Sequence, residues 1–459
     1  MMDTATAARA VHGRLLGGNV RFARVATDSR TLAPGDLFVA IKGERFDGHD
    51  FVRAAFDRGA VAALVADDRA GALAGNLVAV ADPLGALGAL AAHWRARFRI
   101  PVAVIVGSNG KTTVKEMLAA ILRAHYGEAG VLATEGNLNN AIGLPMTLLR
   151  LRPEHEAAAI ELGMNHPGET AELAAIAQPT IAIVNNAQRE HQEFMKSVAD
   201  VADEHAAVVR ALSEGGTAVL NADDPSVDVW RLAARERAGV RVVEFALDHP
   251  AAIRLRAPSA GADGALALTT PAGDAQLRLH APGRHNASNA LAAAAAGLAI
   301  GVPLSAVVGG LEAFRPVAGR LAMLRAASGA AVIDDSYNAN PDSVRAAIDV
   351  LAGVPAPRWL VLGDMGEVGV DGLAFHREAG AYARAAHVDR LLTTGALAAE
   401  SAAAFGEGAE HFASVDALAA HVAATARAGA TILVKGSRFM RMERVVAALC
   451  GPTFREGAH

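Results

Sequence analysis

Short apolar runs bounded by polar turn residues recur along most of the chain. In the first eighty-odd residues, such runs at 38–41, 62–65 and 77–80 predict strands, because each is strand-length and ends at a turn signal. From residue 102 onward the apolar runs 102–106, 157–161 and 181–185 alternate with stretches of helical period. The helical stretches are 115–123 and 198–212. This alternation predicts an α/β fold with a mainly parallel sheet covered by helices on both faces.

Breaks in this pattern divide the chain of 459 residues into three predicted domains, 1–83, 84–314 and 315–459. The first break, near 82–84, precedes a predicted helix at 86–98. Residues 250–282 are richer in Gly, Pro and Thr and predict an antiparallel insertion, and an Ala-rich helix is expected at 289–299. In the third region strands are expected at 331–334, 359–362, 390–393 and 431–434, with helices at 343–351 and 375–386. That region predicts a second α/β unit of Rossmann type.

Composition narrows the class of protein. The chain is 52% hydrophobic and 20% charged, and its net charge of −5 makes nucleic acid an unexpected partner. Cys450 is the only cysteine, which excludes an internal disulfide or a cysteine-based metal cluster. No export signal and no membrane span is visible, so a cytoplasmic location is expected.

The most informative polar segment follows the apolar run 102–106. It contains Gly107, Ser108, Asn109, Gly110, Lys111, Thr112 and Thr113. Glycines permit a tight turn, a helix N-terminus attracts phosphate, and a Lys followed by Thr suits nucleotide phosphates with Mg²⁺. Ile105 occupies the place of the first Gly of the usual phosphate-binding motif, so a fortuitous Gly-rich turn is the alternative. The chain has only five lysines (Lys42, Lys111, Lys115, Lys196 and Lys435), which favours a specific use for Lys111.

Further polar side chains follow predicted strands. Glu161 ends one apolar run, where a carboxylate is well placed to bind Mg²⁺ beside the phosphate loop, although charged residues at strand ends are common. His191 follows the next run, and an ordinary solvated loop histidine is its alternative. Three further polar clusters have different uses. The cluster at 134–140 suits a large polar ligand, and an Asp in 334–341 can accept from a ribose or lie near Mg²⁺, with plain turns as the competing explanation for both. The cluster at 435–438 suits a carboxylate or phosphate. His285 and two asparagines precede the Ala-rich helix, as caps or as readers of a ligand.

Taken together, these segments resemble the Mur ligase family. The matching motifs lie at 28–30, 35–40, 47–49, 107–113, 135–140, 161–165, 283–286, 335–341, 363–367 and 435–438. They occur in order and span nearly the whole chain. Gly-Asn-Leu-Asn-Asn at 136–140 and Asp-Ser-Tyr-Asn-Ala-Asn-Pro at 335–341 point to the branch that adds a D-Ala-D-Ala dipeptide.

The resemblance implies three domains: one that binds the UDP end of a substrate, a central domain that binds ATP, and a mobile C-terminal domain. The implied enzyme is ADP-forming and uses ATP and Mg²⁺ to join D-Ala-D-Ala to UDP-MurNAc-tripeptide through an acyl phosphate, in peptidoglycan synthesis. Such a ligase serves cell wall biogenesis, cell shape and cell division, and a monomer is expected. A sister ligase that adds the third amino acid and folylpolyglutamate synthase are the alternatives within the fold. A P-loop kinase or GTPase and a non-catalytic nucleotide-binding module are alternatives of other classes.

The resemblance also assigns roles to residues. Lys111, Glu161 and His191 are implied to be catalytic, and Thr112, Glu161 and His191 to hold Mg²⁺. Besides 107–113, the residues implied to bind the nucleotide are Asn289, Arg320 and Asp335. Those implied to bind substrate are Asp28, Ser29, Arg30, Asp47, His49, Thr134, Asn137, Asn139, Asn140, Asn338, Asn340, Lys435 and Arg438.

One departure from the family stands out. Many Mur ligases carry a carbamylated lysine that bridges the Mg²⁺ ions, in the helix after the His191 motif. The matching stretch here, 200–205, has no lysine, and Lys196 comes too early to replace it. Either Glu204 or His205 performs the task, or the second metal is held differently.

Overall fold

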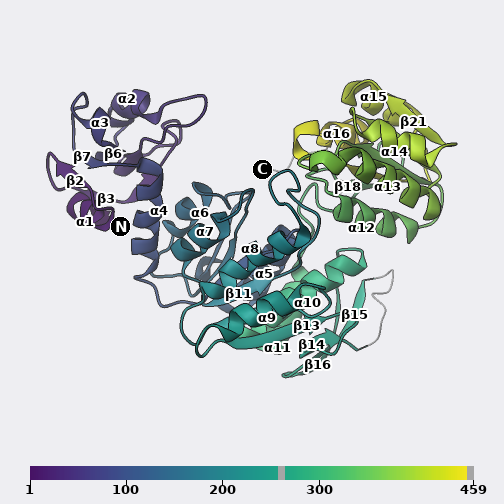
Figure 1. The fold of residues 1–459 in the computed structure, drawn as a ribbon, viewed down its shortest axis with the longest axis horizontal. Coiled ribbons are helices and arrows are strands. Elements are labelled where there is room, and N and C mark those ends of the chain that lie inside the picture. The colour runs from purple at the N-terminus through teal and green to yellow at the C-terminus, as the bar shows by residue number, and fades with distance from the viewer. Residues whose placement is uncertain (257–263, 452–459) are drawn as a thin grey trace.

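The computed structural model describes residues 1–256 and 264–451. Within those residues the strands form three large sheets, one after another along the chain, and one two-stranded ribbon (Figure 1). This is the predicted α/β class, with a mainly parallel central sheet. No helix among the described residues is both long and apolar enough to cross a bilayer.

The N-terminal sheet has the strand order β2-β7-β6-β5-β4, in which only β2 runs antiparallel to its neighbour. Its strands are β2 (Arg14–Leu16), β4 (Arg24–Ala26), β5 (Asp36–Val39), β6 (Ala62–Ala66) and β7 (Leu77–Val80). The ribbon pairs β1 (Met2–Asp3) with β3 (Arg21–Phe22), and the helices are α1 (Thr4–Ala10), α2 (Val52–Asp57) and α3 (Asp67–Ala70). The strands predicted from the first apolar runs are therefore confirmed.

The central sheet has nine strands in the order β16-β15-β14-β13-β12-β11-β8-β10-β9. They are β8 (Val102–Val106), β9 (Val131–Ala133), β10 (Ala157–Glu161), β11 (Ile181–Val184), β12 (Thr217–Asn221), β13 (Arg241–Ala246), β14 (Ile253–Leu255), β15 (Ala265–Thr270) and β16 (Gly273–Arg278). From β9 to β14 across the sheet, adjacent strands are parallel, whereas β15 runs antiparallel to both β14 and β16. The stretch predicted as an antiparallel insertion thus extends the edge of this sheet. Its residues 257–263 lie outside the described residues.

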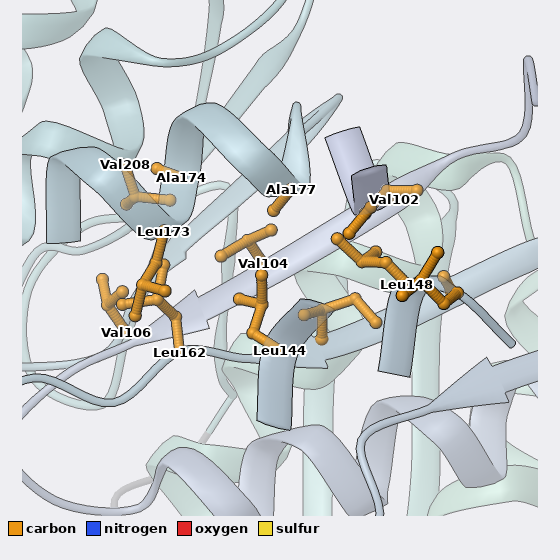
Figure 2. Packing of buried hydrophobic residues seen from close by; sticks show 14 of the residues in the cluster. Val102, Val104, Val106, Leu144, Leu148, Leu162, Leu173, Ala174, Ala177 and Val208 are labelled. Atoms are coloured by element: carbon orange, nitrogen blue, oxygen red, sulfur yellow. The ribbon is translucent and has the colours of Figure 1, made fainter. Parts of the chain in front are cut away.

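Helices cover both faces of the central sheet because β8 is apolar on both sides. Val102, Val104 and Val106 pack in one core cluster, and Ala103 and Ile105 pack in another. Figure 2 shows the first cluster, in which the three valines lie near leucines of neighbouring helices such as Leu144 and Leu173. The central helices are α4 (Pro83–Arg95), α5 (Lys111–Tyr126), α6 (Gly143–Leu148), α7 (Glu169–Ala177), α8 (Val198–Arg210), α9 (Val227–Arg235), α10 (Arg284–Ile300) and α11 (Leu304–Ala313).

The C-terminal sheet has the order β17-β18-β22-β19-β20-β21 and is parallel except for β17. Its strands are β17 (Ala322–Arg325), β18 (Ala331–Asp335), β19 (Arg358–Gly363), β20 (Arg390–Thr394), β21 (Ala409–Phe412) and β22 (Thr431–Lys435). Its helices are α12 (Pro341–Ala352), α13 (Gly372–Ala385), α14 (Ala398–Phe405), α15 (Val415–Thr425) and α16 (Glu443–Cys450). This open parallel sheet confirms the predicted second α/β unit.

The two ends of the central region meet their neighbours differently. Helix α4 carries Leu87 and Leu90 into a core cluster that also contains Val78 of β7 and Leu144 of α6. One apolar core therefore runs from the N-terminal sheet into the central one. The C-terminal sheet has core clusters of its own.

Candidate active site

The phosphate loop joins β8 to α5 through two glycines in conformations that other residues avoid. Gly107 has φ 146° and Gly110 has φ 82°. A Cβ atom on Gly110 would lie 2.4 Å from Asn289 Oδ1, and one on Gly107 would lie 2.9 Å from the Cβ of Asn185. Both positions therefore require glycine, for conformation and for space. Helix α5 begins at Lys111 with no side-chain cap, which leaves its first N–H groups available to an anion.

The segment that follows β11, which contains Asn185 and Asn186, holds this loop by hydrogen bonds. The Asn109 carbonyl accepts hydrogen bonds from Asn185 Nδ2 (2.8 Å) and Asn186 Nδ2 (3.0 Å). In return, the backbone N–H groups of Ser108 and Asn109 donate to the carbonyl and the side-chain oxygen of Asn186. Because those two amides are engaged, the uncapped start of α5 is the part of the loop whose N–H groups remain open to an anion.

Lys111 is folded back over the loop. Its Nζ donates to the carbonyls of Gly107 (2.5 Å) and Ser108 (3.3 Å), and it lies 3.4 Å from Glu190 Oε2. The ammonium group is thus already at the phosphate loop, held by weak neutral acceptors and one carboxylate. A nucleotide phosphate can compete for such a group, since a charged acceptor bonds more strongly than a carbonyl.

On the β10 side of the loop, a buried carboxylate meets the first helical turn. Glu161 ends β10 and is 2% exposed. Its Oε2 accepts from Thr112 Oγ1 at 2.7 Å and its Oε1 accepts from Asn139 Nδ2 at 2.7 Å. Thr134 is also buried there, and its hydroxyl accepts from the Glu161 N–H, so it positions the strand end. The structure therefore brings four predicted site residues together.

On the β11 side lies a second buried carboxylate, Glu190, which sequence reasoning missed. It is 6% exposed and forms ion pairs with Lys111, with His191 Nε2 (3.7 Å) and with His205 Nε2 (3.5 Å). Burial opposes its ionisation, but the charges of Lys111, His205 and His191 prevail and lower the pKa of Glu190 to about 2. His191 itself has the unusual φ of 49°. The one available signal was the adjacency of Glu190 to His191.

The two residues weighed as replacements for the family's lysine behave differently. The carboxylate of Glu204 accepts from the N–H groups of Gly168 (2.9 Å) and Thr170 (2.8 Å), so it is engaged at the start of α7. His205 is buried on α8 and faces Glu190. Only His205 belongs to the site.

The loop after β11 also contacts the C-terminal region. Arg189 forms a forked ion pair with Asp342 of α12 (2.6 Å) and Glu378 of α13 (2.8 Å). His191 Nδ1 lies 2.5 Å from Glu367, and this contact holds the pKa of the Glu367 carboxyl below its usual range. The phosphate loop itself takes part, since the Asn340 side chain bonds Asn109 at 2.9 Å. One short loop thus touches both the phosphate loop and the C-terminal region.

The C-terminal cluster of predicted residues is also assembled. Lys435 Nζ pairs with Asp335 Oδ2 (2.5 Å) and donates to the Asn338 carbonyl (2.9 Å), and burial raises the pKa of the Asp335 carboxyl against the opposing effect of Lys435. Arg320 stacks over the ring of Tyr337 at 4.2 Å. Arg438 lies 5.9 Å from the same ring. A cationic and aromatic face of this kind suits an anionic or planar ligand group.

Other predicted residues lie at the edges of the site or have structural partners. Asn289 is buried and accepts from Asn185 Nδ2 at 2.9 Å behind the phosphate loop. Asn140 caps α6, and Asn137 is exposed beside Asn139. Thr113 follows Thr112 in the first turn of α5.

The N-terminal motifs lie in the first sheet's loops. Asp28 and Arg30 form an exposed ion pair around Ser29. Asp47 caps a short 3₁₀ helix, and its Oδ1 lies 2.6 Å from Nδ1 of the buried His49. Asp47 and His49 therefore already stabilise the loop that carries them, whatever else they bind.

The oxygen atoms beside the loop fit a magnesium ion. Thr112 Oγ1 and the Glu161 carboxylate are adjacent hard donors. No group of three or more His, Cys, Asp or Glu side chains in the described part of the chain is arranged to hold a metal by itself. Mg²⁺ in nucleotide sites usually binds one or two carboxylates together with phosphate oxygens and water, so this donor set agrees with a nucleotide-dependent ion.

Comparisons with known proteins extend over nearly the whole chain. The family models "Mur ligase family, catalytic domain", "Mur ligase middle domain" and "Mur ligase, glutamate ligase domain" match residues 21–126, 105–297 and 319–438. The UDP-N-acetylmuramoyl-tripeptide–D-alanyl-D-alanine ligase of Escherichia coli (strain K12) is 42% identical over 96% of both chains. A crystal structure of MurF from Acinetobacter baumannii has a TM-score of 0.90 at 32% identity and covers 98% of both chains. MurF of Thermotoga maritima, solved with ADP, has a TM-score of 0.81 at 26% identity, over 93% of this chain and 96% of its own.

Proposed function

Because the chain belongs to the Mur ligase family, we propose that it joins D-alanyl-D-alanine to UDP-N-acetylmuramoyl-tripeptide with the use of ATP, in cell wall synthesis. The observation that carries this proposal is the full-length similarity to a ligase of that name, at 42% identity. The similarity includes all three sheets, and therefore every region that would have to handle the two substrates and ATP. Likeness to folylpolyglutamate synthase, at 20% identity, extends to the fold alone.

In the first step, the terminal carboxylate of the tripeptide attacks the γ-phosphorus of ATP. A new carboxyl O–P bond forms and the bond to ADP breaks, which gives an acyl phosphate. The first turn of α5 receives the phosphates, and Lys111 leaves its carbonyl partners to neutralise the transferred group. Thr112 and Glu161 would hold Mg²⁺, which when bound neutralises charge on the phosphoryl oxygens.

In the second step, the amine of D-Ala-D-Ala attacks the acyl carbon. The C–O bond to phosphate breaks, phosphate leaves and the amine nitrogen loses a proton, so that a peptide bond remains. Because water would hydrolyse an acyl phosphate, the C-terminal domain has to cover the site during this step. Asn338, Asn340, Lys435 and Arg438 lie on that domain, within reach of a ligand placed between the domains.

The domain roles follow the same scheme. Residues 1–83 bind the UDP end of the substrate through the loops that carry Asp28 and Asp47, residues 84–314 bind ATP, and residues 315–459 complete the site. Arg320 and Asp335 contact the nucleotide from the third domain. The ion pair of Asp335 with Lys435 and the stacking of Arg320 on Tyr337 support this assignment.

Phosphate release from ATP tests the proposal. Release should require UDP-MurNAc-tripeptide and D-Ala-D-Ala together, and equal release without the dipeptide would exclude the ligase assignment. Lys111→Met should lower kcat by about 10³-fold, because it removes the cation aimed at the transferred phosphoryl group. Lys196→Met is the matched control, since Lys196 is exposed and should leave kcat unchanged.

A further inference from the structure

The mechanism above gives no role to the buried carboxylate of Glu190. It lies six residues beyond the end of β11, on the opposite side of the phosphate loop from Glu161. This follows from the sheet order, in which β8 lies between β10 and β11. The loop that begins at the end of β8 is therefore flanked by two buried carboxylates, one from each neighbouring strand.

The two carboxylates differ in how their oxygens are bonded. Glu161 has a hydrogen-bond donor on each oxygen, Thr112 on one and Asn139 on the other. Glu190 has ion-pair neighbours, but its buried Oε1 accepts no hydrogen bond. The buried Nδ1 of His205 also has no hydrogen-bond partner. An unsatisfied buried carboxylate oxygen is costly, and such an atom is a ready ligand for a cation.

The two carboxylate oxygens of Glu190 face different groups: Oε1 lies beside His205, and Oε2 lies beside Lys111 and His191. Lys111 Nζ is 3.4 Å from Oε2, so the carboxylate faces the mouth of the phosphate loop. His191 Nε2 is 3.7 Å from the same oxygen. His205 lies on the α8 stretch where many related ligases carry a carbamylated lysine, and it approaches Glu190 from the other side. Glu204 is committed to the cap of α7.

We propose that Glu190, held in place by His205, is this chain's replacement for the carbamylated lysine and ligates a divalent cation that binds together with the nucleotide. The proposal rests on the proposed function, because the nucleotide phosphates supply the remaining ligands. A cage made of protein groups alone is not required for such an ion. His191 Nε2 lies 3.7 Å from Oε2 of the same carboxylate.

This arrangement removes a requirement for CO₂, which a lysine carbamate would impose. A lysine carbamate forms by addition of CO₂ to a neutral amine and is lost when CO₂ is removed. A glutamate side chain is encoded, and its charge does not depend on CO₂. The site is therefore independent of bicarbonate, although its shape requires two residues that lie 15 positions apart on different elements.

Binding of manganese to the protein–ADP complex tests the cation site without catalysis. Mn²⁺ suits carboxylate and phosphate ligands and can be followed by electron paramagnetic resonance. Glu190→Gln keeps the shape but removes the charge, and should weaken Mn²⁺ binding at least about tenfold. Glu193→Gln, an exposed carboxylate of the same loop, should bind as the wild type does. Unchanged affinity in Glu190→Gln would overturn the proposal.

Removal of CO₂ tests the wild-type protein itself, which matters if Glu190→Gln does not fold. Ligase activity in CO₂-free buffer should equal that with bicarbonate, and intact-protein mass should show no carbamate. Activity that falls and returns with bicarbonate would overturn the proposal. A wild type that forms no product from the two substrates would instead refute the proposed function, while the manganese titration would still report on the cation site.

Discussion

The N-terminal and C-terminal neighbours of the central sheet are attached by opposite kinds of chemistry. On the N-terminal side, Leu87 and Leu90 of α4 lie in a core shared by both sheets. On the C-terminal side, polar side chains of the phosphate loop and of the loop after β11 make the contacts: the Arg189 fork, the amide pair of Asn109 with Asn340, and His191 with Glu367.

This difference indicates which of the two attachments, here called the apolar joint (N-terminal side) and the polar joint (C-terminal side), can open. Separating the first would expose leucine surface to water, which costs roughly 25 cal/mol per Å². The groups of the second can exchange their partners for water, so half-exposed ion pairs contribute little net free energy. We therefore expect the N-terminal and central regions to move as one body and the C-terminal region to move against them.

The largest effect should come from breaking the apolar joint. Leu90 is fully buried, so Leu90→Ala should lower the free energy of unfolding by about 2–5 kcal/mol, through lost burial and the cavity left behind. Chemical denaturation measures this. Loss of activity at an unchanged midpoint would argue against a structural role for α4.

The next effect should come from the polar joint. Arg189→Ala removes the fork to Asp342 and Glu378, and should lower kcat/KM by about 10- to 100-fold while stability stays nearly unchanged. Arg235→Ala, an exposed arginine on α9, is the control. A fall in unfolding free energy as large as that of Leu90→Ala would remove the contrast between the joints.

Asn340 has two roles, as the cap of a helix and as a contact between domains, and two substitutions can distinguish them. Its Oδ1 caps α12, whereas its Nδ2 donates to Asn109. Asn340→Ala should cost about 1 kcal/mol of stability, because it removes the cap. Asn340→Asp keeps a capping oxygen and loses the donor, so it should affect only the ligase rate. Equal destabilisation by both variants, measured by thermal unfolding, would mean that the domain contact itself supports the fold.

The smallest effect concerns pH at the N-terminus of α10. Burial, with a contribution from nearby Lys435, lowers the pKa of His285 to about 4, so the folded protein holds this ring neutral. The unfolded chain takes up the proton first, and stability should therefore fall as the pH drops from about 6.5 towards 4. Because the side chain is partly exposed, we expect less than about 1 kcal/mol. His285→Asn should flatten the pH profile of unfolding, and an identical profile would exclude the assignment.

The sequence predicted the features that depend on residues close together along the chain. The apolar run, the glycines and Lys111 are consecutive, and Glu161 ends a strand that the alternation already indicated. Glu190 was missed because its importance depends on His205, which α8 brings back to it. The Arg189 fork joins residues 153 and 189 positions apart, a distance at which local pattern carries no information. Lysine scarcity was a partial guide, since fully buried Lys115 bonds the Thr134 carbonyl and supports the fold.

That scarcity has a practical use in covalent labelling. An amine-reactive reagent meets exposed Lys42 and Lys196 first, Lys111 is partly covered, and Lys435 and Lys115 are shielded by the folded protein. The five acylation rates, measured on separate peptides, therefore report separate opening events in one molecule. The acylation rates of the two surface lysines report the reactivity of the reagent, and the rate of Lys115 reports global unfolding. The slower acylation of Lys435 relative to the surface lysines reports how often its own surroundings open.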